Sequence, residues 1–261
     1  MISKHIRPFS LVYPVILCLV ASCSNSSSVS STGTSVTLAI TPAAVNHAAM
    51  TAGSKTFTTT EGVQITLNKA YLVISNSSLT TSCGVDFSAR TLLNQLIPSA
   101  NAHTSQTPTA TGEPVVINIL NADNSDTPLG NVSPPAGDYC GVELTISAAD
   151  VDASGLPNDA DMVGASLFIS GSYSQTSPSA QGAIHVETGA TLISRKLLLA
   201  SLVMLSPTQL NGAIDLEIHY DTWFDTVDLA ALETETASST SPVSPQVSQL
   251  LSNVTASIHQ K

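Results

Sequence analysis

The stretch DYCGVELTIS, residues 138–147, decides the fold class. Its apolar side chains alternate with polar or small ones, and the apolar set is Cys140, Val142, Leu144 and Ile146. Alternation with a period of two is typical of a β-strand that has one face in a core and one in water. The stretch therefore predicts a strand that buries the Cys140 side.

The same pattern recurs along the chain from residue 36 onward. Val63, Ile65 and Leu67 alternate with polar residues, and the apolar run 71–74 continues that strand. Further strands are predicted at residues 115–120, 166–172, 183–188, 196–205 and 213–220. Short strands at this spacing predict an all-β, two-sheet antiparallel sandwich.

Helical periodicity is scarce. One short helix is predicted at residues 89–97, where Pro98 ends it, and a second at residues 247–254. Residues 233–246, which are rich in Thr, Ser and Pro, are expected to form a loop between the last strand and the second helix.

The first residues have the pattern of a bacterial export signal. Lys4 and Arg7 precede an apolar run over residues 9–20, and the quartet Val-Ala-Ser-Cys ends at Cys23. The run is shorter than the roughly 18 to 20 residues that span a bilayer. We expect cleavage before Cys23 and attachment of lipid to Cys23; the alternative is an ordinary signal peptide cut near Ala21.

Three segments follow from this prediction: a signal peptide at 1–22, a Ser-rich lipid-anchored tether at 23–35, and one β-sandwich domain at 36–261. Ser24 after the lipidated cysteine favours the outer membrane, with the body facing the periplasm or the cell surface. The mature chain would keep 8 − 2 = 6 basic residues against 19 acidic ones, a formal charge of −13. Nucleic acid is therefore not an expected partner, whereas the membrane is.

Cleavage and lipidation would leave two thiols, Cys83 and Cys140. In an oxidising compartment these most simply form one disulfide. A metal site with two thiolates is the alternative.

Several passages together resemble the MbnP-like periplasmic proteins, also called the metallo-mystery-pair family. These passages are EGVQITLNKAYLVISNSSL, AGDYCGVELTI, ADMVGASLFISGSY and AIHVETGAT, and they fall between Val63 and Asp228. The resemblance implies an exported β-rich protein that binds copper and works beside a di-haem cytochrome. Only His185 matches a histidine of the family pattern, and the family's four-cysteine arrangement is absent.

The histidines show no short metal-binding spacing, so any site must be assembled by the fold. Imidazole suits copper or zinc, and we expect His185 and His219 to form the pair, with His103 or His259 as a third ligand. The alternative for His219 is a surface position beside Asp215 and Glu217.

The only tryptophan, Trp223, follows His219 closely in the segment HYDTWFD. The resemblance makes it a candidate neighbour of the metal. The alternative is a large ring that seals one end of the sandwich.

An acidic loop offers a second, weaker candidate for a metal site. Asp150, Asp152, Ser154 and Asp161 place oxygen side chains at positions 1, 3, 5 and 12 of an EF-hand-like loop, with Gly155 at position 6. Pro157 stands at the usual branched apolar position, and no helices flank the loop. A calcium site and a solvated turn between strands both remain open.

The chain has no G-x-S-x-G, no H-E-x-x-H and no phosphate-binding glycine loop, so we do not expect an enzyme. Two functions remain. One is a metal-binding or redox-accessory lipoprotein, and the other is a structural or adhesive surface lipoprotein that binds a protein or glycan without metal.

Overall fold

The computed structural model describes residues 33–82, 107–176, 179–189, 194–232, 235–237 and 243–261. The predicted signal peptide and the predicted helix at residues 89–97 lie outside these ranges, as does almost all of the predicted tether. The described chain forms two β-sheets, one α-helix and two 3-10 turns, so the all-β sandwich is confirmed.

The smaller sheet has four strands in the order β12-β10-β1-β5. Its strands are β1 (Ser35–Ala43), β5 (Thr127–Val132), β10 (Asn211–His219) and β12 (Ile258–Gln260). The pairing of β1 with β10 is parallel, which departs from the expected all-antiparallel arrangement. Strands at the two ends of the chain thus lie in one sheet.

The larger sheet has eight strands, six of them in the order β11-β8-β7-β3-β6-β9. These six are β3 (Gln64–Thr80), β6 (Gly137–Ile146), β7 (Leu167–Thr176), β8 (Ser179–Thr188), β9 (Arg195–Leu205) and β11 (Glu235–Ala237). The short strands β2 (Lys55–Thr58) and β4 (Val115–Asn118) both pair with β3. The strand predicted from Val63 and continued by residues 71–74 is one strand, β3, which begins at Gln64 and extends to Thr80.

Helix α2 (Pro245–Ala256) starts where its sequence provides a cap. The Ser244 side chain accepts a hydrogen bond from the Val247 N–H, and Pro245 takes the first helical position. The helix predicted at residues 247–254 is therefore confirmed. The predicted loop 233–246 is wrong in part, because Glu235–Ala237 pairs with β8 as β11 and the helix already includes Pro245 and Gln246.

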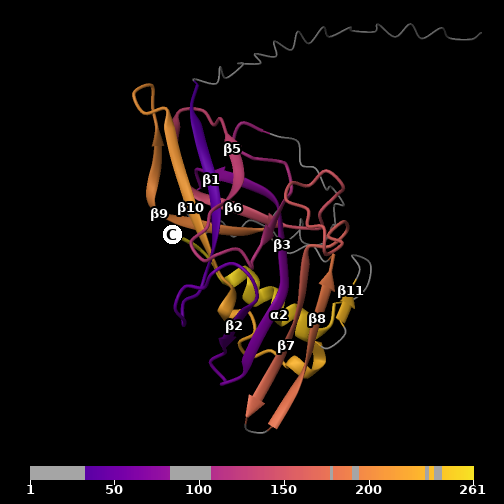
Figure 1. The fold of residues 1–261 in the computed structure, drawn as a ribbon. Helices are drawn as coiled ribbons and strands as arrows, with labels where there is room; N and C mark the ends of the chain where they lie inside the picture. Colours follow the sequence, from indigo (N-terminus) through magenta and orange to yellow (C-terminus); the bar gives the residue numbers. More distant parts are fainter. Residues whose placement is uncertain (1–32, 83–106, 177–178, 190–193, 233–234, 238–242) are drawn as a thin grey trace, which may run out of the picture.

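The main core lies between the two sheets and α2. It contains Val142, Leu144 and Ile146 of β6, together with Ile214, Leu216 and Ile218 of β10 and four residues of α2. Figure 1 shows α2 below the four-stranded sheet and beside the long strands β7 and β8. The faces predicted for β10 are confirmed by this burial, and Cys140 is buried as predicted, at 5% exposure. The prediction for β6 is wrong at Tyr139, which was expected on the wet face and is instead buried in the main core, where the pairing of β6 with β9 shifts register.

A second, smaller cluster covers the outer face of the larger sheet. It packs Tyr71 and Val73 of β3 and Val116 of β4 against Ala149, Ala153, Met162 and Ala165. The acidic loop that begins at Asp150 covers this cluster. The loop is therefore part of a packed layer.

Candidate functional site: a histidine pair at the sheet edge

Strands β10 and β12 bring two histidines together on the outer face of the smaller sheet. Their antiparallel register places Glu217 opposite His259, and His219 follows two residues after Glu217 on the same face of β10. The two imidazole rings stack with centroids 4.9 Å apart and planes 26° apart. The fold thus unites His219 with one of its two predicted third ligands.

Glu217 adds a carboxylate to this pair. His219 Nε2 lies 3.2 Å from Glu217 Oε2, and both side chains are largely but not fully buried, at 19% and 24% exposure. A carboxylate beside an imidazole fixes the orientation of the ring and favours a cation nearby. The predicted alternative, a surface histidine beside carboxylates, describes part of this geometry but misses the second imidazole.

The surroundings favour the neutral form of His259. Desolvation by the surrounding atoms is the largest cause that lowers its pKa from the ordinary 6.5, and positive charge at His219 and Arg195 adds to it. Glu217 opposes this shift. Because metal ions bind the unprotonated imidazole, His259 remains available as a ligand at a lower pH than an ordinary histidine.

His185 lies in the other sheet. It faces outward from β8, opposite Ser170 of β7, and its ring meets Phe168 edge-on with centroids 5.5 Å apart. Its described contacts are therefore with a sheet that does not contain His219. His103, the other predicted third ligand, lies outside the described residues.

Trp223 is fully buried at the C-terminal end of the short turn η1 (Tyr220–Thr222). Its indole N–H donates to Ser257 Oγ at 2.9 Å, and the Ser257 carbonyl accepts from the His219 N–H at 3.1 Å. The ring therefore fills the core at one end of β10, as the packing alternative predicted, and a shared partner links it to the backbone of His219.

Polar groups of the acidic loop form hydrogen bonds within the protein. Ser154 bonds through its N–H to the Pro114 carbonyl and through its own carbonyl to Val116, and Asp161 accepts from the Val163 N–H. Gly155 has φ +77°, and the Val116 carbonyl approaches it so closely that a Cβ would lie 2.6 Å from that oxygen. Asp152 is exposed and Asp150 is half-buried. Calcium binding at this loop stays a prediction.

Cys140 lies beside the end of β3. Its Sγ is 3.7 Å from the Thr80 carbonyl oxygen, three residues before Cys83 in the sequence. Cys83 itself lies outside the described residues, so the disulfide stays a prediction.

Sequence reasoning missed a charged cluster inside the protein. Lys55 and Asp123 form an ion pair with side chains 0% and 1% exposed. The Tyr220 hydroxyl donates to Asp123 Oδ2 at 2.9 Å, and Lys55 Nζ lies 4.2 Å from the centre of the Tyr220 ring. Burial raises the pKa of Tyr220 far above its ordinary range, with Asp123 adding to the shift. Nothing in a local pattern distinguishes these residues from surface charges.

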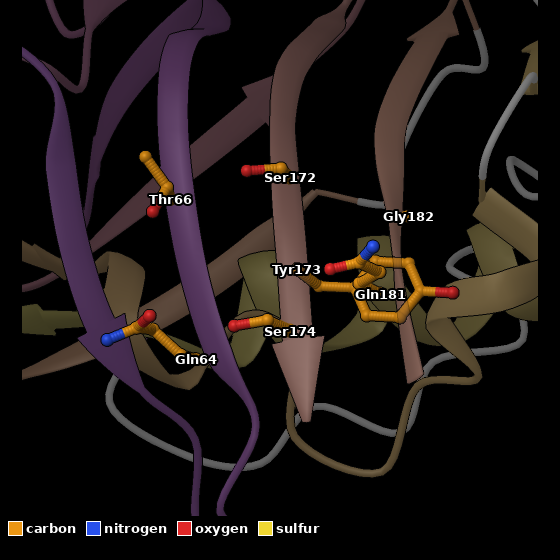
Figure 2. Close-up of a pocket in the computed structure, with 7 residues that line it drawn as sticks. All are labelled: Gln64, Thr66, Ser172, Tyr173, Ser174, Gln181 and Gly182. Carbon is orange, nitrogen blue, oxygen red and sulfur yellow. The ribbon is translucent and has the colours of Figure 1, made fainter. Parts of the chain in front are cut away.

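A polar hollow lies on the outer face of the larger sheet (Figure 2). It has a volume of about 440 Å³ and is lined by Gln64, Thr66, Ser172, Tyr173, Ser174, Gln181 and Gly182. Gln64, Ser174 and Gln181 are neighbours across β3, β7 and β8. The lining has amide and hydroxyl groups but no charged side chain.

Two structural absences complete the description. Within the described ranges, no three His, Cys, Asp or Glu side chains form a group that could hold a metal ion. None of the helices in those ranges is long and apolar enough to cross a membrane.

Comparison with known proteins gives one structural likeness. No family model and no curated protein matches the chain. Among solved structures, MbnP from Methylosinus trichosporium is similar over 83% of this chain and 86% of its own, with 12% sequence identity and a TM-score of 0.38. The likeness is distant, so the argument for function rests on the residues of this chain.

Proposed function

We propose that this chain is an exported lipoprotein whose β-sandwich binds one transition-metal ion, copper by preference, through His219 and His259. The observation that carries the proposal is the stacking of these two rings at a centroid distance of 4.9 Å. Two imidazoles with a nearby carboxylate suit copper or zinc better than calcium or magnesium.

The donor set supports a site with two protein nitrogens. His259 lies on the three-residue strand β12 and is exposed, so its ring can turn from the stacked arrangement to share an ion with His219. Glu217 then serves as the acceptor that orients His219. Water or a donor from a partner would complete the coordination. A redox-accessory role beside a di-haem cytochrome belongs to this proposal as its most specific form.

The test is a copper titration of the purified full chain, followed by metal analysis after dialysis. We expect one copper ion per chain, and a loss of tight binding in both His219→Ala and His259→Ala. His185→Ala is the matched control, since this histidine packs against Phe168 in the other sheet. Copper retained in both single variants, or lost in His185→Ala, would contradict the proposed ligands.

A second candidate function follows from the hollow of Figure 2. Its amide and hydroxyl lining suits a neutral, hydroxyl-rich ligand such as a glycan, which is the adhesive function without metal. A glycan-binding screen of wild type against Gln181→Ala tests it. Gln181→Ala should lose glycan binding and keep copper, whereas His259→Ala should lose copper and keep glycan binding.

A further inference from the structure

Exposed apolar side chains are concentrated on β9 and the turn after it, here called the β9–β10 segment, which passes from the larger sheet to the smaller one. Among the described residues, seven large apolar side chains are exposed, and four of them are Leu198, Leu202, Met204 and Leu210, at 57%, 49%, 54% and 38% exposure. They lie on β9 and in the turn that joins it to β10. Solvent-exposed apolar groups gathered in one place mark a surface for interaction more often than scattered ones do.

The backbone of this region holds the four side chains outward. Leu197 and Leu205 of β9 are buried, while Leu198 and Met204 beside them are exposed. Between the two parts of β9 that pair with β6 the register shifts, and the Ala200 N–H is bound at 2.6 Å by the side chain of Gln260. The turn closes through reciprocal backbone bonds of 3.0 Å between Ser206 and Gln209. The exposed set therefore belongs to a strand and a turn that are held by hydrogen bonds.

The turn of the β9–β10 segment lies at the point where the chain enters the folded body. Ser35, the first residue of β1, is paired with Asn211, and its N–H donates to the Leu210 carbonyl at 2.8 Å. Figure 1 shows the turn between β9 and β10 at the same end of the molecule as the start of β1. Cys23 precedes Gly33 by only ten residues, so an extended chain spans at most about 35 Å between them.

Charge also fits a lipid surface. Residues 197–214 contain no Asp, Glu, Lys or Arg, although the chain carries a net charge of −11. Most of the acidic surface would be repelled by anionic lipid, whereas the residues of the β9–β10 segment contribute no such repulsion. Asp138 is the acidic residue that pairs beside Met204 in the sheet.

We propose that the β9–β10 segment docks on the lipid bilayer, inserting Leu198, Leu202, Met204 and Leu210 among the lipid headgroups next to the anchored Cys23. The inference rests on the proposed lipoprotein function and gives the anchored body an orientation. A lipid chain alone leaves the body free to tumble, while a second, apolar contact fixes one face toward the membrane. The hollow of Figure 2, on the outer face of the larger sheet, lies on strands β3, β7 and β8 and is not part of the docked β9–β10 segment.

The test uses tryptophan fluorescence, because the only native tryptophan, Trp223, is fully buried. The full chain is recovered from host membranes as Leu202→Trp and, as the matched control, Val151→Trp, which replaces an exposed valine of the acidic loop. Each protein is mixed with vesicles of phosphatidylcholine with and without bromine on the acyl chains. We expect a blue shift and strong quenching by brominated lipid for Leu202→Trp only.

A second variant separates docking from mere exposure. Adding Met204→Glu to Leu202→Trp should remove most of the quenching, because a carboxylate inserts poorly into the headgroup region. Adding Val163→Glu, at a valine of similar exposure elsewhere, should leave the quenching unchanged.

The outcomes distinguish the docking from the anchor. A chain that sediments with vesicles but shows no quenching of Leu202→Trp overturns the docking and keeps the anchor, as does equal quenching of Val151→Trp. A chain that does not sediment and carries no acyl group by mass spectrometry overturns the anchor. In that case the quenching of unacylated Leu202→Trp is measured at high vesicle concentration. Quenching supports the docking, and its absence overturns the docking.

Discussion

Lys55 and Asp123 form an ion pair that is closed off from water, held between β2 and the segment that follows β4. Asp123 also accepts the Met50 N–H at 2.7 Å, and the Asp123 N–H donates to the Met50 carbonyl at 2.8 Å. The pair thus ties the loop before β2 to the loop after β4. Burial is the larger influence on Lys55 and lowers its pKa, while Asp123 opposes the shift.

Lys55→Met should lower the free energy of unfolding by about 3–5 kcal/mol, because it leaves a buried carboxylate without its cation. Lys55→Met with Asp123→Leu should recover part of this loss. Lys69→Met is the control: Lys69 and Asp159 form an exposed pair at 3.5 Å, and its loss should change stability by less than about 1 kcal/mol. Urea denaturation measures all three. Equal effects of the two lysine substitutions would show that Lys55 is not buried as described.

Copper binding should weaken as the pH falls, and it should do so below the ordinary histidine pKa of 6.5. Since the surroundings lower the pKa of His259, its folded form stays neutral after an unfolded histidine has taken up a proton. Because the pKa of His259 is lower in the folded state, its contribution to the stability of the folded state is fully present above pH 6.5. That contribution is lost as the pH falls toward the lowered pKa. Titration of copper at stepped pH values checks the midpoint. Arg195→Gln should move the midpoint upward, because it removes a nearby positive charge.

Gly155→Ala should destabilise the acidic loop severely, by more than about 2 kcal/mol, because its Cβ would clash with the Val116 carbonyl as well as strain a positive φ. Gly164 provides a matched control in the same loop. It has φ +85° and no atom within 4 Å of an added Cβ, so Gly164→Ala should show only the conformational cost of about 1–2 kcal/mol. Thermal unfolding compares the two. A Gly164→Ala variant as unstable as Gly155→Ala would remove the clash as the reason.

The predicted disulfide between Cys83 and Cys140 should protect both thiols from alkylation until a reductant is added. Mass spectrometry of peptides after alkylation, with and without reduction, checks this directly. Reduction should cost about 2–5 kcal/mol of stability, since the bond closes a long loop. Alkylation of Cys140 in the unreduced, unfolded protein would exclude the bond.

Local sequence patterns predicted the faces of the strands but not their partners. The alternation in β6 and β10 follows from one face in the core and one in water, and it was assigned correctly except at Tyr139, where a register shift turns the predicted wet face of β6 into the core. Strand β1 shows no such alternation, since most of its residues are buried. Its parallel partner β10 lies far along the chain, and no short-range signal records that pairing.

The candidate site was predictable only in part for the same reason. His219 was assigned to the wet face of its strand, where the structure shows it. Its neighbour His259 lies on a three-residue strand, too short to show a period of its own. His185 belongs to the larger sheet, and sheet membership depends on pairing between distant segments. The buried ion pair depends on two loops meeting, which composition does not reveal.

The smaller sheet has a consequence for how the protein matures. Its neighbours in space, β12, β10 and β1, are the last, the tenth and the first strands in sequence. A nascent chain on the ribosome therefore has β1 available long before its partners emerge. The smaller sheet can be completed only after β10 and β12 have been synthesised. Removing the last few residues would deprive β10 of one neighbour and His219 of the imidazole on which it stacks.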